Sequence, residues 1–184
     1  MRKLTMLMLA VFAFQLQATT NQLQATTKET SSQVKISWQN PEKYADIRPA
    51  NESKKSYQAQ VINSFDKIWT KLAEKLPAGY YLELTITDLD LAGDVNPMYR
   101  LANNDVRVIK DIYFPRMQLN YILYNADKQI VGQANDVKIK DMGFMTSGSA
   151  TFTSREFAYE SEMIKKWFNK EILTKTTGLT SIKQ

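Results

Sequence analysis

Apolar residues recur every three or four positions between Ser53 and Leu76, and this period constrains the fold more than any other feature of the chain. It is the pattern of a helix with one buried face. The buried stripe comprises Tyr57, Val61, Ile62, Phe65, Ile68, Trp69, Leu72 and Leu76. Asn51 or Ser53 can cap the start of this helix, and Pro77 to Gly79 end it. Such a helix requires an apolar layer to cover.

A second helix of about twenty residues is expected from Ser154 onward, because apolar residues again recur at helical spacing. Its stripe comprises Phe157, Ile164, Trp167, Phe168 and Ile172. We expect the aromatic residues of both stripes to form the core and not a cofactor site.

Alternation of apolar and polar residues predicts four strands, over residues 34–38, 80–87, 106–123 and 130–140. The third is expected to be long, with a kink at Pro115, and Asn125 to Gln129 should form the hairpin turn before the fourth. The resulting order is strand, helix, strand, strand, strand, helix. It predicts an α+β two-layer sandwich, in which a four-stranded mixed sheet carries both amphipathic helices on one face.

Two aspartates follow the second strand in the same phase as its buried residues. Asp88 and Asp90 continue the alternation of Leu82, Leu84 and Ile86, so an unbroken strand would point them into the core. Either the strand ends at Thr87, or cations hold the two carboxylates. Arg48 and Arg116 are the candidate cations, and turn hydrogen bonds around Gly93 are the alternative structural role.

The expected topology places the long loops at one end of the molecule. A crossover followed by two hairpin-like connections makes the first, second and fourth strands point the same way, so three long loops leave from one edge. Both helix N-termini should lie there and add N–H donors. Long loops in compact domains are commonly functional. The candidate ligand- or partner-binding residues at this end are Asp46, Arg48, Asp88, Asp90, Asp94, Lys110, Asp111 and Asp141.

The N-terminal residues have the pattern of a cleavable secretory signal. Arg2 and Lys3 precede the apolar run from Leu4 to Phe14, and small residues follow at Ala18 and Ala25. We expect a signal peptide over 1–25, a flexible linker over 26–32, a single domain over 33–175 and a tail over 176–184. With no Cys there is no lipidation site, and no segment is expected to span the membrane. These features predict a monomeric periplasmic protein.

Composition argues against several classes of function. The net charge is +5 and the lysines form no basic run, which argues against a nucleic-acid partner. The chain has no His, so zinc sites and Ser-His-Asp triads are excluded in their usual forms.

Two functional hypotheses follow from the acidic residues. In the first, the loop end binds an envelope protein or a small molecule without catalysis and without a cofactor, and the sequence favours this reading. In the second, the carboxylates hydrolyse an envelope polymer such as a glycan, with or without a divalent metal. Asp88, Asp90 and Asp94 offer the oxygen ligands that calcium prefers, although their spacing matches no twelve-residue calcium loop. No catalytic residue can be assigned.

Four segments resemble one known family when taken together. They are the segments 38–49, 87–95, 108–115 and 140–144, which read WQNPEKYADIRP, TDLDLAGDV, VIKDIYFP and KDMGF. They resemble the exported bacterial family catalogued as domain of unknown function 3016, which occurs mainly in Gram-negative species. The family is uncharacterised, so the resemblance implies export but no activity, cofactor or catalytic residue.

Overall fold

The computed structural model describes residues 33–44, 46–47, 49, 53–95, 98, 106–146 and 156–177. All of them belong to one compact unit, Ser31–Gln184. The predicted signal peptide and linker lie outside the described residues, as do Arg48 and the chain after residue 177.

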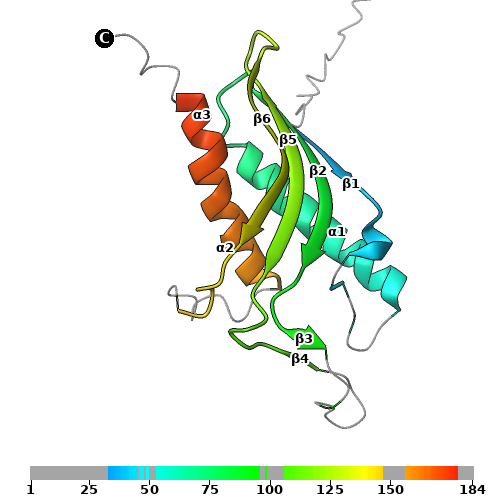
Figure 1. Ribbon diagram of the computed structural model, residues 1–184. Helices are drawn as coiled ribbons and strands as arrows, with labels where there is room; N and C mark the ends of the chain where they lie inside the picture. Colours follow the sequence, from blue (N-terminus) through cyan, green and yellow to red (C-terminus); the bar gives the residue numbers. More distant parts are fainter. Residues whose placement is uncertain are drawn as a thin grey trace, which may run out of the picture. The chain divides into compact units, whose positions relative to one another are not determined.

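A four-stranded mixed sheet forms one layer of the domain (Figure 1). Its strands are β1 (Val34–Trp38), β2 (Tyr81–Asp90), β5 (Arg116–Tyr124) and β6 (Ile130–Lys140), in the spatial order β1-β2-β5-β6. β1 is parallel to β2, and the pairs β2–β5 and β5–β6 are antiparallel. The predicted sheet and its strand directions are therefore confirmed, with β1, β2 and β6 pointing the same way.

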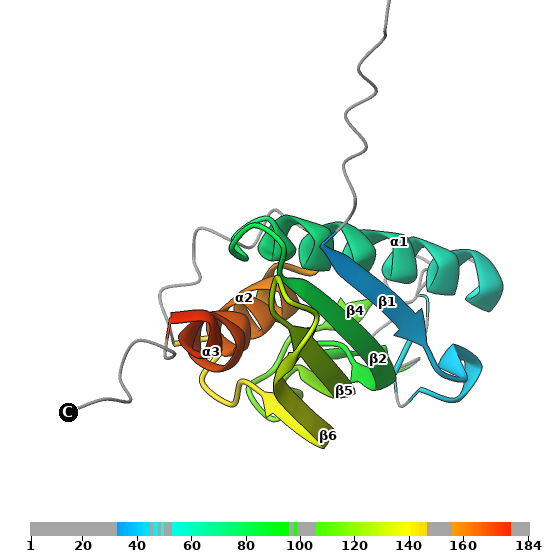
Figure 2. The same cartoon turned by 90° about the horizontal axis from the view of Figure 1, so that it is seen from above.

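The helices form the second layer, on one face of the sheet (Figure 2). α1 (Lys54–Ala73) begins at Ser53, whose hydroxyl accepts the backbone N–H of Ser56 at 3.1 Å, so Ser53 is the cap. α2 (Ala158–Trp167) continues through a π-helical segment (Phe168–Leu173) into α3 (Thr174–Thr177). The predicted second helix is thus present, but it begins after Phe157, and it changes from an α-helix to a π-helix and back to an α-helix.

The core lies between these two layers, as the apolar stripes predict. Trp69 of α1 meets Trp167 of α2 edge-on, with ring centroids 6.1 Å apart. The side chains buried between the sheet and the helices include Val61, Phe65, Leu82, Leu84, Ile86, Leu119, Leu123, Ile164, Phe168 and Ile172. The aromatic residues of both stripes therefore belong to the core or pack against it.

An extra residue in β2 changes which side chains point inward. The pairing of β2 with β5 shifts between Ile86 and Asp88, so Thr87 is inserted as a bulge. Leu89, which has no exposed surface, takes the inward position, and Asp88 and Asp90 are only half-buried. The bulge shifts the alternation by one residue, so neither aspartate takes the inward position that an unbroken strand would give it. The strand continues past Thr87 to Asp90.

The predicted long third strand was also wrong. The chain instead forms β3 (Asp94–Val95) and β4 (Arg107–Val108), which pair with each other in a separate two-stranded sheet. A turn follows β4, in which Tyr113 N donates to Lys110 O at 3.0 Å, and β5 starts only after Pro115. Pro115 has no N–H for a sheet ladder, and it separates the two pieces.

Candidate functional site

The ends of β1, β2 and β6 and the start of β5 lie together at the lower end of the molecule in Figure 1. The N-termini of α1 and α2 lie at the same end. We call this region the loop end, and it comprises the described residues within 39–53, 91–115 and 141–157. The structure places Asp46, Lys110, Asp111 and Asp141 in its loops, Asp94 in β3, and Asp88 and Asp90 near the end of β2, which leads into it.

Three of the predicted aspartates join different elements of the loop end through ion pairs. Asp46 pairs with Arg107 of β4, with Oδ2 2.7 Å from Nη1. Asp90 of β2 accepts from Arg116 Nε of β5 at 2.8 Å, which confirms Arg116 as a cation for this aspartate. Asp141, after β6, pairs with Lys166 of α2 at 2.8 Å. In the positions described, these carboxylates tie strands, loops and helices to one another.

Asp111 and Asp141 each follow a lysine directly in the sequence, at 110–111 and 140–141. The structure gives these aspartates other partners. Asp141 binds Lys166, and Asp111 Oδ1 accepts the backbone N–H of Ile112 at 2.9 Å. Lys110 and Asp111 line neither of the two cavities described below.

Asp46 reaches its place because the chain returns to β2 after β1 ends. A 3₁₀ turn (Pro41–Lys43) reverses the chain, and Tyr44 then donates its hydroxyl to the carbonyl of Ile86 at 2.7 Å. Asp46 follows as an isolated parallel bridge beside Asp90. The loop therefore continues along the edge of β2 where β1 leaves off.

A buried polar cluster lies behind these contacts and consists of Asp46, Arg107, Glu160 and the backbone of Ala92. Glu160 is 3% exposed, and its Oε1 accepts the Ala92 N–H at 2.7 Å. Arg107 donates to the carbonyls of Ala92 at 3.4 Å and Gly93 at 3.1 Å. The cluster joins α2, β4 and the loop after β1 at one point of the main chain.

Sequence reasoning missed both Arg107 and Glu160. Glu160 lies three residues after Phe157 and four before Ile164, in phase with the apolar stripe of its helix. A charged residue in such a stripe is the signal that could have marked it, because a buried charge requires partners.

The environment of this cluster changes the ionisation of its members. Burial raises the pKa of Glu160, and the Ala92 N–H and the charge of Arg107 offset this only in part. Burial lowers the pKa of Arg107, but hydrogen bonding and attraction to Asp46 outweigh burial and leave that pKa above its ordinary value. Burial also raises the pKa of Tyr57 of α1, against the opposing charge of Arg107. The cluster thus holds a charged arginine next to a carboxyl that resists ionisation.

A cleft of about 220 Å³ opens beside the cluster, which we call the Arg116 cleft. In this cleft the guanidinium of Arg116 lies 5.5 Å from the ring centroid of Phe114. The lining of the Arg116 cleft comprises Asp46, Asp90, Gly93, Asp94, Ile112, Tyr113, Phe114 and Arg116. Three of the predicted acidic residues therefore meet in one cleft.

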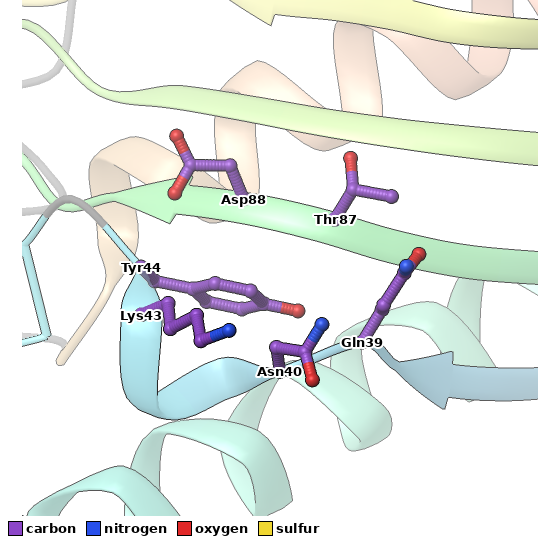
Figure 3. Close-up of a pocket in the computed structure, with 6 residues that line it drawn as sticks. All are labelled: Gln39, Asn40, Lys43, Tyr44, Thr87 and Asp88. Atoms are coloured by element: carbon purple, nitrogen blue, oxygen red, sulfur yellow. The ribbon is translucent and has the colours of Figure 1, made fainter.

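Asp88 lines a different cavity, shown in Figure 3, of about 370 Å³. Its other lining residues are Gln39, Asn40, Lys43, Tyr44 and Thr87. Asp88 is thereby separated from Asp90 and Asp94, which line the Arg116 cleft. Within the described ranges, no three acidic side chains are grouped to hold a metal ion. Calcium binding at Asp88, Asp90 and Asp94 stays a hypothesis that rests on the oxygen ligands that these side chains offer.

Large apolar side chains are exposed at the loop end. Ile112 is 65% exposed, Met142 61% and Met145 49%, and Met98, between β3 and β4, is 88% exposed. The backbone bond from Asp141 N to Pro115 O, at 3.3 Å, holds the loops of Ile112 and Met142 together. Ile130, the other large apolar residue exposed among those described, lies at the hairpin at the opposite end of the sheet.

A comparison with protein families matches residues 32–170 to the protein of unknown function DUF3016. The chain belongs to the DUF3016 family. The match extends from β1 into the π-helical segment and includes every candidate site residue named above. Neither the curated proteins nor the solved structures gave a match to this DUF3016 chain. Among the described residues, no helix has the length and apolar character needed to cross a membrane.

Proposed function

We propose that this DUF3016 protein is a non-catalytic, periplasmic binding domain that holds an envelope protein against its loop end. The observation that carries the proposal is the exposure of Ile112, Met142 and Met145 on adjoining loops. Apolar side chains gathered on a surface favour association with a partner, because contact removes them from water. Methionine side chains are flexible and polarisable, which suits an adaptable contact surface.

The ion pairs of the loop end support binding more than hydrolysis. Asp46, Asp90 and Asp141 each meet a basic side chain from a neighbouring element. Ties of this kind hold loops in one arrangement, and a preorganised surface loses less conformational entropy when it binds. The acidic residues then act as supports for the exposed apolar side chains.

Crosslinking in living cells of the native host tests the proposal. A photoactivatable amino acid replaces Met142, and in a matched strain it replaces Ile130, which is 53% exposed at the other end of the sheet. We expect discrete crosslinked products of higher mass from position 142 and none from position 130. The protein should be released with the periplasmic fraction by osmotic shock. Equal crosslinking from both positions, or none from either, would contradict binding at the loop end.

The Arg116 cleft gives the hydrolase alternative one specific observation, since Asp46, Asp90 and Asp94 all line it. An Asp94→Asn variant separates the two functions. Hydrolysis of glycans, peptides or phosphoesters that this variant abolishes, while the crosslinks from position 142 persist, would establish the enzyme. Under the binding proposal, neither the wild-type protein nor the Asp94→Asn variant hydrolyses any of these substrates.

A further inference from the structure

We propose that the outer edge of β6 and the adjacent side of α2 bind an extended acidic peptide segment, which adds to the sheet as a fifth strand. This surface lies along the side of the domain, and the inference is independent of partner binding at the loop end. Three features carry it: a groove, an unpaired strand edge and the distribution of charge.

The groove has a volume of about 280 Å³ and lies between β6 and the helical layer. Lys138, Ile139 and Lys140 line one side, and the other is lined by Met163, Lys166, Trp167 and Lys170 together with Asp141 at one end. Ile139 and Met163 are buried and Trp167 is half-buried, so the floor is apolar. The helical residues follow i, i+3, i+4, i+7 spacing and extend over about 10 Å, which is the length of three residues of extended chain.

The strand edge beside this groove has its backbone groups available. β6 lies at the outer edge of the sheet, and β5 is its one partner among the described strands (Figure 2). Its pairing shifts between Val137 and Ala134, where Asp136 has a positive φ of 53° and its N–H binds Asn120 Oδ1 at 2.8 Å. Beyond this bulge, residues 137–140 make no hydrogen bond on their outer side to any described residue. An exposed edge of this kind is a template for a further strand.

The charges around the groove favour an acidic occupant. Lys166 pairs with Asp141, and Lys138 lies 3.5 Å from Asp136 in an exposed pair. No acidic side chain lies within ion-pair distance of Lys140 or Lys170 among the described residues. The lining of the groove includes four lysines and one aspartate, so the groove is positive.

Strand geometry then specifies the pattern of the peptide. Lys138 and Lys140 lie two residues apart on one face of β6, about 7 Å from each other. A strand added beside them would place alternate acidic side chains against these lysines and the intervening apolar side chain over Trp167. Lysines also serve to block pairing between edge strands of separate copies. That role accounts for Lys138 and Lys140 but not for Lys170 and Trp167 across the groove.

The test measures binding of a fluorescein-labelled peptide with alternating Asp and Leu residues to the purified protein by fluorescence anisotropy. The variant Lys140→Glu/Lys170→Glu should weaken binding by roughly tenfold or more, because it replaces two positive charges of the groove lining with two negative ones. The matched control is Lys67→Glu/Lys71→Glu, which makes the same charge change on exposed positions of α1. The control should stay within about twofold of wild type, since its charges lie away from the groove. Equal loss in both variants overturns the proposal.

Two further measurements separate strand addition from general charge attraction. A peptide with the same side chains but alternate N-methylated amides cannot complete the ladder, and it should bind at least roughly tenfold more weakly. Amide hydrogen exchange of residues 137–140 in the wild-type protein should slow when the unmodified peptide binds. Equal binding of the N-methylated peptide, or unchanged exchange at saturation, overturns the proposal. So does binding to anionic phospholipid vesicles, lost in Lys140→Glu/Lys170→Glu, without any binding of the peptide.

Discussion

Arg107 and Arg116 each hold an aspartate at the loop end, but they differ in exposure. The side chains of the Arg107–Asp46 pair are 19% and 8% exposed, against 56% and 14% for Arg116–Asp90. Removing one member of a buried pair leaves the other charge in a medium of low polarity, whereas an exposed pair contributes little. We therefore expect Arg107→Met to lower the free energy of unfolding by about 3 kcal/mol.

The control for this prediction is Arg116→Met, which should lower the free energy of unfolding by less than about 1 kcal/mol. Urea denaturation of the two variants and the wild type measures both values under the same conditions. Similar losses in the two variants would show that the burial of Asp46 does not decide the strength of its pair.

Glu160 predicts an unusual dependence of stability on pH. Its pKa in the folded protein is raised above the ordinary value of 4.5, chiefly by burial. Between 4.5 and the folded pKa the native state binds more protons than the unfolded state, so this residue makes stability fall as pH rises. Glu160→Gln keeps an oxygen for the Ala92 N–H and removes the titration. The variant should therefore lack this fall and be at least as stable as wild type at neutral pH.

Denaturation of wild type and Glu160→Gln at a series of pH values checks this prediction. The difference between the two curves isolates Glu160, because the other ionisable groups are common to both proteins. A variant that is less stable than wild type at neutral pH would show that the ionised carboxylate is stabilising next to Arg107.

At the scale of elements, periodicity predicted helices and strands well and their irregularities poorly. Ser53 was one of two proposed caps, and the stripe from Tyr57 to Leu76 predicted α1. Nothing in the sequence indicated the bulge at Thr87, because a residue inserted in a strand is of the same types as the strand residues around it. Arg107 lies between Val106 and Val108, so the sequence pattern predicts a solvent-exposed position on a strand. In the structure its side chain instead forms an ion pair with Asp46. Such partners depend on the approach of distant segments.

The connection from β2 to β3 depends on Gly93. Its φ is +83°, and a Cβ atom there would lie 2.7 Å from the carbonyl oxygen of Val108. Both the left-handed backbone and the close contact oppose any side chain. Gly93→Ala should lower the free energy of unfolding by about 1–3 kcal/mol.

Gly143 provides the matched control, because its nearest neighbour would be Thr146 Oγ1 at 3.5 Å, an ordinary contact distance. Gly143→Ala should change stability by less than about 0.5 kcal/mol. Thermal and urea denaturation of both variants measure the difference. A Gly93→Ala protein as stable as the Gly143→Ala protein would contradict the tight approach of Gly93 to β4.

At the scale of the whole molecule, the sequence predicted the two-layer sandwich and the end at which the candidate residues gather. It did so because strand direction follows from the order of elements and the lengths of their connections. The division of the acidic residues between two cavities was not predictable. It depends on the Thr87 bulge and on the path that brings Asp46 beside Asp90.

Melting of the purified protein in chelator and then with excess calcium tests the predicted metal site directly. A ligand at about a hundred times its dissociation constant adds about 2.7 kcal/mol of stability. For a domain of this size this raises the melting temperature by roughly 5 to 10 °C. Because Asp88 and Asp90 line different cavities, we expect a rise of less than about 1 °C. A full rise that Asp88→Asn abolishes would establish the metal site.

Ala92 is bound through both of its backbone polar groups. Its N–H donates to Glu160, and its carbonyl accepts from Arg107. Arg107 also pairs with Asp46, so α2, β4 and the loop after β1 are connected by one continuous set of polar contacts. A displacement that breaks one of these contacts removes a charge partner from the next. The loop end should therefore open as a cooperative unit, and exchange of the Ala92 amide proton would report the free energy of that opening for all three segments.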